Sequence, residues 1–450
     1  MKQQYVLASS QIISFNPILK EDQICQLHYF LYLRKLVSLI KYNKRKYPKA
    51  QLKFYQKILC GDRSLPHHAK PSILPSRYQY MIPFDLALIL GLPDQGDFSD
   101  KISMITKQLC HDFKLFGNSR QFLYNEFAAA LGSPKAWDAV KHSPELREYK
   151  EYLDLVRENI IFVTKRPYNV LITANMSAGK STLINALTGK NISLTQNMAC
   201  TSKIHTIVSK PFDDGVTSEY DHDLSLDASS EDLLSDNTRN LSSKITVGTF
   251  FNGELSGKRV VLLDSPGVNS SENTDHMEIT QNIIRSRKYQ LMLYVMNATQ
   301  LGTNDEELHL EMIKEQIGRT PIIFIINKVD QLITDQDNIP DIIQRQKQFL
   351  ISKGFKNPLI CPVSSQAAYL AKKQLSGPLS FLEEDELFMN LCKFKKQSLS
   401  DYYTKNLNCK PIPESENKIQ NLLGSCGFAY LEQIINHLYD GGKVNGSGLC

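Results

Sequence analysis

Residues 171–189 read LITANMSAGKSTLINALTG, and this stretch decides the fold expected around it. An apolar, β-prone run ends at Ala174, a polar loop follows, and a helix-forming sequence continues from Lys180. A loop between a strand and a helix N-terminus points backbone N–H groups inward at the positive end of the helix dipole. The stretch departs from the Gly-x-x-x-x-Gly-Lys-Ser/Thr pattern only at Ala174, a position that mainly begins the turn. We therefore predict a phosphate-binding loop.

The residues of this loop suit separate tasks on a bound phosphate chain. Gly179 lets the backbone approach closely, Lys180 reaches the β- and γ-phosphates, and the Ser181 hydroxyl is a ligand for Mg²⁺. The residues expected to surround the nucleotide here are Asn175, Ser177, Ala178, Gly179, Lys180, Ser181 and Thr182. Alone, the loop could also be a plain strand-to-helix turn, so the prediction depends on the stretches that follow.

From Tyr168 onwards, short β-rich runs alternate with helical ones. Strands that are nearly all apolar indicate a parallel sheet covered by helices on both faces. We predict an α/β fold with a mostly parallel sheet, preceded by a mainly helical N-terminal domain. In such sheets ligands bind at the carboxyl ends of the strands. The strand candidates are YNVLITA (168–174), RVVLLD (259–264), YQLMLYVMNA (289–298), PIIFIIN (321–327) and LICPVSS (359–365).

A second polar group follows the strand candidate VVLLDSPG at 260–267. Asp264 ends this strand and can hold Mg²⁺ through water. Gly267 is free to turn towards a γ-phosphate. Asp-x-Pro-Gly alone is a common turn, so its value lies in its order after the phosphate loop.

The stretch IIFIINKVD at 322–330 predicts which base is bound. Asp330 can accept hydrogen bonds from N1–H and from the 2-amino group of guanine, whereas adenine offers no such pair of donors. The stem of Lys328 would cover the ring, and Asn327 would brace the loop and the base. Ser364 and Ser365 follow the next strand and can offer hydroxyl and N–H groups near the guanine oxygen. The four groups in this order predict GTP as the ligand.

A threonine that senses the γ-phosphate and binds Mg²⁺ is expected between residue 188 and the strand near Ile245. Spacing alone leaves Thr195, Thr201 and Thr206 open.

Taken together, several stretches resemble the bacterial dynamin family of GTPases. They are MSAGKSTLINAL (176–187), NMACTSKIHTI (197–207), LLDSPGVNSSENTDHMEIT (262–280), LYVMNATQLGTNDEEL (293–308) and FIINKVDQL (324–332). The resemblance covers about 165–370 and implies GTP hydrolysis to GDP and phosphate. It favours Thr201 as the sensing threonine, so Ser181, Thr201 and Asp264 become the expected metal ligands. Ser177, Lys180 and Thr201 become the expected catalytic residues.

The same resemblance implies a cation and a partner. The family's serine at the position of Ser177 is expected to bind a monovalent cation, K⁺ or Na⁺, beside the β/γ bridge, where negative charge grows in the transition state. Met176 stands where eukaryotic dynamins place a glutamine, and no glutamine follows Gly267. We therefore expect slow hydrolysis in the monomer and stimulation by a homodimer formed through the GTPase face.

Apolar spacing, turn residues and charge set the expected domains, and the resemblance names one of them. A mainly helical, basic domain is expected at 1–142, and a dynamin-type GTPase domain at 143–442 that begins with a long helix from about Pro144. An acidic insertion is expected at about 211–240 and a flexible tail at 443–450. Only about 80 residues follow Ser365, too few for the family's full stalk. The chain therefore resembles a short form, and membrane fission is not expected from it.

Charge is segregated along the chain. Between Cys25 and Phe84 there are twelve Lys and Arg and one acid, whereas 213–236 holds nine acids and no Lys or Arg. The basic run at 34–57 is either a solvated helical face, paired in part with the acidic loop, or a contact for an anionic membrane surface. Nucleic acid is the least favoured partner but stays open. The acidic loop itself is interpreted as a mobile surface insertion.

The cellular compartment follows from cysteine use and hydropathy. The nine cysteines form no Cys-x-x-Cys pair, and no signal peptide is evident. No stretch reaches the roughly 18 apolar residues of a membrane-spanning helix. We expect a cytoplasmic protein, with peripheral contact at the inner face of the membrane as an extension. The function then stays open between a dynamin-like, self-associating GTPase and a switch-type regulatory GTPase whose N-terminal domain binds protein or RNA.

Overall fold

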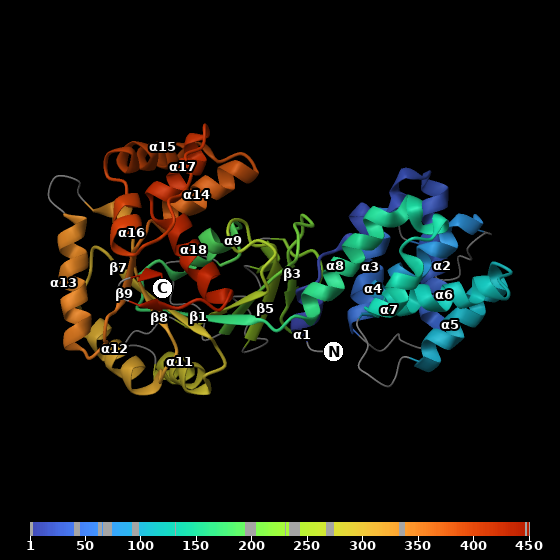
Figure 1. Ribbon diagram of the computed structural model, residues 1–450, viewed down its shortest axis with the longest axis horizontal. Helices are drawn as coiled ribbons and strands as arrows, with labels where there is room; N and C mark the ends of the chain where they lie inside the picture. The colour runs from blue at the N-terminus through green and yellow to red at the C-terminus, as the bar shows by residue number, and fades with distance from the viewer. Residues whose placement is uncertain are drawn as a thin grey trace. The chain divides into compact units, whose positions relative to one another are not determined.

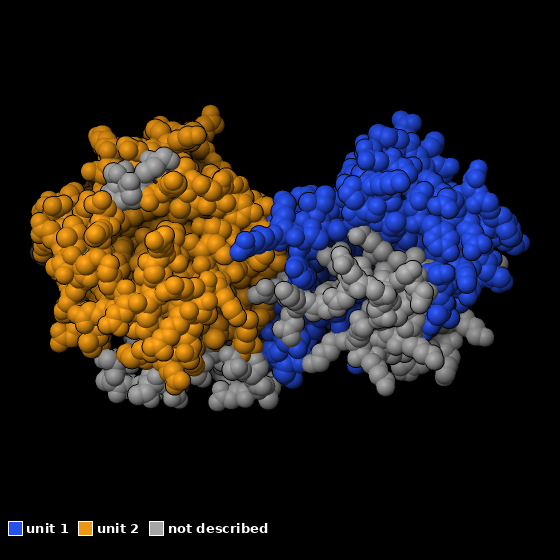
Figure 2. Space-filling view, turned by 60° about the horizontal axis from the view of Figure 1, so that its bottom comes forward, with its two compact units in different colours: residues 1–166, 210–229 blue, residues 167–209, 230–450 orange. Residues whose placement is uncertain are grey.

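A computed structural model of the chain forms two compact units, coloured separately in Figure 2. Unit 1 contains residues 1–166 and 210–229, and unit 2 contains residues 167–209 and 230–450. The residues that the structure describes are 3–39, 46–61, 65, 74–91, 99–130, 132–193, 204–229, 231–233, 244–266, 274–332, 338–445 and 448–449. Among these residues, no helix is both long enough and apolar enough to cross a bilayer.

Unit 1 is mainly helical, as the sequence predicts. Its α-helices are α1 (Gln3–Leu7), α2 (Gln23–Leu39), α3 (Lys46–Cys60), α4 (Ile82–Leu90), α5 (Ser99–Asp112), α6 (Asn118–Ala130), α7 (Pro134–Val140) and α8 (Lys150–Thr164). Short 3₁₀ turns lie at η1 (Ile12–Phe15), η2 (Pro17–Lys20), η4 (Ser76–Tyr80) and η5 (Pro144–Tyr149), and β3 (Ser218–Tyr220) pairs antiparallel with β4 (Leu224–Ser225). Helix α4 is buried along most of its length and forms the centre of the unit.

A buried carboxylate joins several elements of unit 1. Asp85 on α4 accepts hydrogen bonds from the hydroxyls of Tyr29, Tyr55 and Tyr152, which lie on α2, α3 and α8. A further bond comes from Nδ2 of Asn16, at 2.8 Å. Burial raises the pKa of the Asp85 carboxyl, and these hydrogen bonds oppose the rise. The carboxylate thereby fixes four separate segments around one point.

The helix expected from Pro144 differs from the observed one. Residues 144–149 form the 3₁₀ turn η5, and the α-helix α8 begins only at Lys150, because Tyr149 leaves α-helical geometry with φ −102° and ψ 3°. The apolar face of α8, which includes Tyr152, Leu153 and Val156, belongs to the core of unit 1. The sequence placed this helix with the GTPase domain because the two adjoin in the chain. Its packing instead assigns it to the helical unit.

The described part of the acidic segment is packed rather than mobile at the surface, so that interpretation is wrong for residues 210–229. Lys210 and Asp214 form an ion pair at 2.8 Å with both side chains fully buried. Asp214 also accepts a hydrogen bond from the backbone N–H of Gln11, at 2.6 Å. Ser218 and Glu219 on β3 are buried as well. The remainder of the segment, apart from residues 231–233, lies outside the described residues.

The basic run forms one exposed side of α3. Lys49, Lys53 and Lys57 are four residues apart and exposed, whereas Phe54 and Tyr55 are buried on the other side. Lys57 forms an ion pair with Asp227 of the acidic segment. These contacts favour a solvated, partly paired helix face. Lys41, Lys44 and Arg45 lie outside the described residues.

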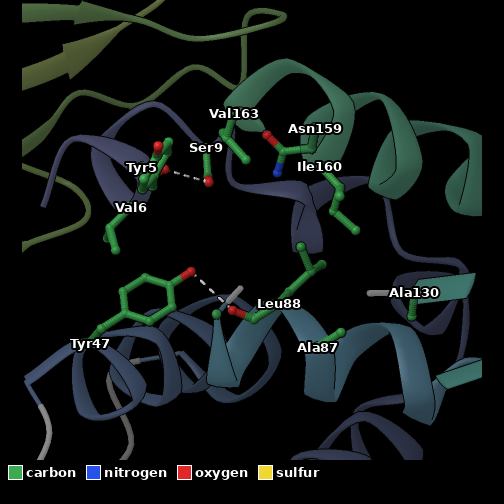
Figure 3. A pocket seen from close by; sticks show the side chains of 11 residues that line it. Tyr5, Val6, Ser9, Tyr47, Ala87, Leu88, Ala130, Asn159, Ile160 and Val163 are labelled. Atoms are coloured by element: carbon green, nitrogen blue, oxygen red, sulfur yellow. Dashed lines mark hydrogen bonds between the residues drawn. The ribbon is translucent and has the colours of Figure 1, made fainter. Parts of the chain in front are cut away.

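A small cavity lies within unit 1, lined mostly by apolar side chains (Figure 3). Its volume is about 30 Å³, room for roughly two water molecules. The Tyr47 hydroxyl donates to the Leu88 carbonyl at 2.9 Å at its edge. The Asn159 amide is already bonded to the backbone of Ser10 at 2.9 and 3.0 Å. The cavity is therefore too small, and its polar groups too occupied, for a substrate.

Unit 2 contains the predicted sheet. Its strand order is β5-β2-β6-β1-β7-β8-β9, and neighbouring strands run parallel except for the antiparallel pair β2 and β6. The strands are β1 (Tyr168–Ala174), β2 (Ile204–Ser209), β5 (Lys244–Thr249), β6 (Val260–Asp264), β7 (Leu291–Asn297), β8 (Ile322–Asn327) and β9 (Leu359–Pro362). The mixed, mostly parallel sheet agrees with the prediction.

Helices cover both faces of this sheet. Figure 1 shows α9, α14 and α18 on one side and α11 and α12 on the other. The α-helices of unit 2 are α9 (Lys180–Thr188), α11 (Thr274–Ser286), α12 (Asn304–Gln316), α13 (Ile339–Ser352), α14 (Ser365–Ser376), α15 (Phe381–Lys396), α16 (Ser400–Asn406), α17 (Lys418–Ser425) and α18 (Phe428–Tyr439), with a 3₁₀ turn η6 at Val329–Gln331. A buried ion pair between Lys372 on α14 and Glu432 on α18, at 2.6 Å, joins two of these helices.

The segment expected as a flexible tail contains two extended dipeptides. β10 (Val444–Asn445) pairs antiparallel with β11 (Gly448–Leu449). Backbone pairing of this kind gives even a short terminal stretch a defined conformation.

Candidate nucleotide-binding site

The phosphate loop joins β1 to α9. Ala174 is the buried last residue of β1 and pairs with Val295 of β7, so an extended residue with a side chain fits where the pattern has glycine. Gly179 precedes α9 with φ +85°, and a Cβ atom there would lie 2.4 Å from Nδ2 of Asn327. Only glycine meets both demands, because other residues are strained at positive φ and would collide with Asn327.

Two exposed residues occupy the middle of this loop. Met176 is 45% exposed, and Ser177 is exposed with φ +61°. A non-glycine residue in the left-handed region costs about 1 kcal/mol or more. Such strain often marks functional loops. Ser177 therefore holds its hydroxyl at the solvent-facing side of the loop in a conformation that its own backbone does not favour.

Lys180 and Asp264 form an ion pair across neighbouring strand ends. β1 and β6 run parallel with Ile172 opposite Asp264, which brings the carboxylate close to the first turn of α9. The two side chains are 14% and 9% exposed. Ser181 and Thr182 follow in the same helical turn and are half-buried. The ammonium and the carboxylate that the sequence assigns to phosphate and to Mg²⁺ thus neutralise one another in this structure.

Asn327 at the end of β8 connects the phosphate loop to the loop after β9. Its Nδ2 donates to the carbonyl of Ala178 at 2.9 Å, and its Oδ1 accepts from the N–H of Ser365 at 3.0 Å. The side chain is 2% exposed. A single amide therefore sets the distance between the phosphate side and the base side of the site.

Asp330 and Ser364 are joined by a hydrogen bond of 2.5 Å from the serine hydroxyl to Oδ1. Ser364 also caps α14 by accepting from the N–H of Ala367, so its position is fixed by the helix. Lys328 adopts the left-handed conformation with φ +65°, which turns the chain between Asn327 and Asp330. The ammonium of Lys393 donates to the carbonyls of Asp330 and Leu332 and holds this loop from α15.

Two residues of α12 behind the loop were missed by sequence reasoning. His309 is buried, its Nδ1 lies 3.1 Å from Oδ1 of Asn175, and its Nε2 lies 3.4 Å from Oγ1 of Thr173. Burial lowers the pKa of His309 to about 4, so the imidazole is neutral at physiological pH. A neutral ring that donates through Nδ1 and accepts through Nε2 satisfies both contacts. α12 thereby supports the first residue of the phosphate loop.

Glu306 lies one turn before His309 and has a similar supporting position. Its side chain is buried and accepts from the N–H of Gly302 at 2.6 Å, and burial raises its pKa. A cavity of about 160 Å³ next to the loop is lined in part by Asn175, Met176 and Glu306. The stretch NATQLGTNDEEL includes Glu306 and adjoins His309, so it carried a signal, but no pattern in it showed which side chains face β1.

The structure gathers most of the predicted residues at one edge of the sheet. Asp264 and Asn327 are the last residues of β6 and β8, and the remaining residues follow the ends of β1, β8 and β9: the loop residues, Lys328, Asp330, Ser364 and Ser365. Thr201, Gly267 and the alternative Thr195 lie outside the described residues. Thr206 lies within β2, opposite Leu263, and is fully buried.

Comparison with known proteins finds a family model that matches part of unit 2. Residues 170–329 match the family model described as "Dynamin family". An uncharacterized protein in the xynA 3′ region of Caldicellulosiruptor sp. (strain Rt8B.4) is 26% identical over 283 residues, which is 60% of this chain and 65% of that protein. The match thus covers slightly less than two thirds of the relative's length.

Solved structures also match this chain, with low TM-scores. An oligomerised bacterial dynamin pair, described as a mechanism for long-range sensing and tethering of membranes, covers 96% of this chain and 62% of its own at 15% identity and a TM-score of 0.37. The match to a dimerization-deficient mutant of Toc33 from Arabidopsis thaliana covers 62% of this chain and 86% of that chain, at 10% identity and a TM-score of 0.34. The match to a point mutant of Aquifex aeolicus Era bound to GDP·AlF₄⁻ covers 56% of this chain and 59% of that chain, at 19% identity and a TM-score of 0.27. Similarities of this size support no inference about function.

Proposed function

We propose that this chain, whose residues 170–329 belong to the dynamin family, binds GTP and hydrolyses it to GDP and phosphate. One observation carries the proposal. The phosphate loop, Asp264 at the end of β6 and the loop that contains Asp330 all lie at the carboxyl ends of the strands. The Asn327 amide connects two of these parts, because it bonds to the Ala178 carbonyl at 2.9 Å and to the Ser365 N–H at 3.0 Å. A plain strand-to-helix turn needs none of these connections.

The base side of the site suits guanine. The Asp330 carboxylate has two oxygens, and Ser364 uses Oδ1. Bound guanine would offer N1–H and the 2-amino group to the same carboxylate, which has lone pairs left for them. Adenine would leave these acceptors unmatched, which costs affinity. The chemistry therefore selects GTP over ATP.

The phosphate side supplies positive charge and hard oxygen ligands. The Ser181 hydroxyl and the Asp264 carboxylate are donors of the kind that Mg²⁺ prefers, so they fit this ion. When bound with GTP, Mg²⁺ would neutralise charge on the β- and γ-phosphates. Lys180 has to leave Asp264 and turn to the phosphates in order to serve the same purpose. We infer that the Lys180–Asp264 ion pair belongs to the nucleotide-free protein, where it neutralises a nearly buried carboxylate.

Ser177 is the proposed holder of a monovalent cation beside the β/γ bridge. Two variants separate its hydroxyl from its backbone strain. Ser177→Gly relieves the positive φ and removes the hydroxyl, whereas Ser177→Ala keeps the strain and removes the hydroxyl. We expect both to lose K⁺ or Na⁺ stimulation of phosphate release. Stimulation that survives in either variant would exclude the hydroxyl as a cation ligand.

Hydrolysis is proposed to depend on a homodimer formed through the nucleotide face. The exposed side chain of Met176 has no polar group that could orient the attacking water, so a single copy has no catalytic side chain at this position. The test is phosphate release per molecule over a range of protein concentrations, with sizing in GDP, a GTP analogue and a transition-state mimic. A flat rate and an unchanged size in every nucleotide would reject the dimer and leave GTP hydrolysis standing.

Contact with an anionic membrane is a separate proposal, supported by the exposed lysines of α3. Co-sedimentation with anionic vesicles, with and without a GTP analogue, tests it against the switch-type alternative. Loss of binding in a Lys49→Glu, Lys53→Glu variant would support the membrane. Equal recovery in the supernatant for both proteins would favour a regulatory GTPase whose N-terminal region binds protein or RNA.

A further inference from the structure

Helix α15 of unit 2 presents apolar side chains on two opposite sides. Leu387 and Phe394 are buried against the rest of the unit. On the other side Phe381, Leu382, Phe388 and Met389 are 75%, 76%, 64% and 68% exposed. Figure 1 shows α15 at the outer side of unit 2, beyond α14 and α17. Clustered apolar groups of this size on a soluble surface indicate an interaction site.

The exposed residues form one continuous strip, which we call the α15 outer face. Phe381 and Phe388 are seven residues apart, as are Leu382 and Met389, so each pair lies on the same side of the helix. Exposed Asp385 and Cys392 continue this side between and after the pairs. The α15 outer face consists of Phe381, Leu382, Glu384, Asp385, Phe388, Met389, Cys392, Lys395 and Lys396.

Charge is divided along this face. Glu384 and Asp385 lie near the N-terminal end, and Lys395 and Lys396 lie at the C-terminal end, all exposed. Other charged residues of the helix have partners within the unit. Glu383 pairs with Lys373 at 2.5 Å, Glu386 accepts from Gln366 at 3.0 Å, and Lys393 donates to backbone carbonyls.

We propose that the α15 outer face is a dimer interface that pairs with the same face of a second copy of this chain in antiparallel orientation. A twofold axis near Phe388 places the acidic end of each helix beside the basic end of the other. It also brings the two Phe388 and Met389 pairs together at the centre. In a parallel pair, acids would face acids and lysines would face lysines. The helix dipoles are also opposed favourably only in the antiparallel pair.

A second copy fits this surface better than an anionic membrane does. Glu384 and Asp385 lie beside Phe381 and Leu382, so an anionic lipid surface would repel the end of the helix with the most exposed apolar groups. The same acids find complementary lysines on a copy of the same helix. Self-complementarity of both apolar and charged groups is what a twofold interface requires.

The first test measures mass by sedimentation equilibrium without nucleotide. We expect the full chain to dimerise, and Phe388→Asp to raise the dissociation constant at least roughly tenfold, because central aromatic residues dominate such interfaces. Ile351→Asp is the matched control, since Ile351 on α13 is 50% exposed and lies outside the α15 outer face. This control should dimerise like the unchanged protein.

The second test uses charge to establish the orientation. A Glu384→Lys, Asp385→Lys variant has a fully basic face, and a Lys395→Glu, Lys396→Glu variant has a fully acidic one. We expect each alone to be monomeric and an equimolar mixture to form heterodimers. A variant with all four changes restores complementarity in the antiparallel pair and should dimerise again.

Three results would overturn the proposal. They are a monomer at the highest soluble concentration, equal dimerisation of the Phe388→Asp variant, and dimerisation of each charge variant alone. Binding of the unchanged monomer to vesicles through Phe388 would assign the face to membranes instead. The measurements need no nucleotide, so they are independent of the proposed GTPase activity. A Lys180→Ala protein should give the same dissociation constant as the unchanged chain.

Discussion

Asp85 and Asp264 are two of the buried or nearly buried carboxylates among the described residues, and they are satisfied in opposite ways. Asp85 in unit 1 is fully buried and receives hydrogen bonds from three tyrosines and one asparagine. Asp264 in unit 2 is 7% exposed and is neutralised by the flexible side chain of Lys180. The donors of Asp85 come from separate packed segments and cannot move independently. In the proposed function, Lys180 exchanges the carboxylate for a phosphate. The contacts of Asp85 therefore hold packed segments of unit 1 together, whereas the proposed role of the Asp264 ion pair requires that it open for a ligand.

Removal of the Lys180 ammonium should have the largest effect on activity. In Lys180→Ala we expect phosphate release to fall by about 10²- to 10³-fold, because a fixed positive charge at the developing negative charge is lost. The thermal midpoint should change less than in any variant of Asp85. Phosphate release and thermal melting measure the two effects, with Lys356→Ala as an exposed control. A large loss of stability with retained turnover would show that the pair is structural.

A change at Asp330 tests which base the proposed nucleotide site selects. In Asp330→Asn we expect the GTP dissociation constant to rise roughly 100-fold, since hydrogen bonds to a charged acceptor, worth about 1.5–3 kcal/mol each, are weakened. The amide would offer an N–H to the 2-carbonyl of xanthine, so XTP should bind better than to the unchanged protein. Titration with labelled GTP and XTP measures both. Equal loss for both nucleotides would place Asp330 outside the base site.

A change at Asp85 tests how much this buried carboxylate contributes to the stability of the fold. Asp85→Asn turns one acceptor oxygen into a donor and leaves two of the four bonded groups facing it. We expect the free energy of unfolding to fall by about 3 kcal/mol, because each unsatisfied buried group costs roughly 1–3 kcal/mol. Denaturant unfolding measures this, and the exposed Asp138→Asn should stay within about 0.5 kcal/mol. GTP hydrolysis per folded molecule should not change. A loss of turnover without a loss of stability would contradict a purely structural role for Asp85.

His309 gives an effect that depends on pH and is small near neutral pH. Its pKa is lowered from 6.5 to about 4 by burial, so below pH 6.5 the unfolded chain takes up a proton that the folded chain refuses. Stability from this group is complete above pH 6.5 and is lost as pH falls towards about 4, by about 3 kcal/mol over the whole window. The ionisable neighbours Glu306 and Tyr294 stay protonated more readily because burial raises their pKa.

The measurement is the free energy of unfolding between pH 4 and 7 in the unchanged protein and in His309→Gln. We expect the variant to lose stability less steeply as the pH falls. His142→Gln is the control, because His142 is exposed and should leave the slope unchanged. An identical slope in His309→Gln would show that another group titrates in this window.

Much of unit 2 could be predicted from local sequence. YNVLITA is β1 residue for residue, and PIIFIIN differs from β8 by one residue at its start. Apolar runs of strand length between turn residues specify strands wherever both faces are buried. The candidate site residues in these loops could be named from the sequence because each lies at or next to a strand end. Their neighbours were missed where the contact crosses the chain, as between His309 and Asn175, 134 residues apart.

Unit 1 shows the limit of such reasoning. Its helical character follows from apolar spacing, but the same spacing does not say which helix faces which. Helix α8 and residues 210–229 adjoin segments of unit 2 in sequence and nevertheless pack in unit 1. Hydrophobic burial is non-directional, so an apolar face accepts any partner of suitable shape. Only the three-dimensional packing selects one.

The sequence by itself determined which polar residues stand at the strand ends and predicted a nucleotide site there, because glycine, lysine, aspartate and asparagine have few other uses in that order. It also determined the alternation of strands and helices, which depends on residues close together in the chain. The tertiary structure alone decided that Lys180 neutralises Asp264, that His309 supports Asn175 and that three tyrosines surround Asp85. Each of these contacts joins residues far apart in the chain, whose meeting depends on how whole elements pack.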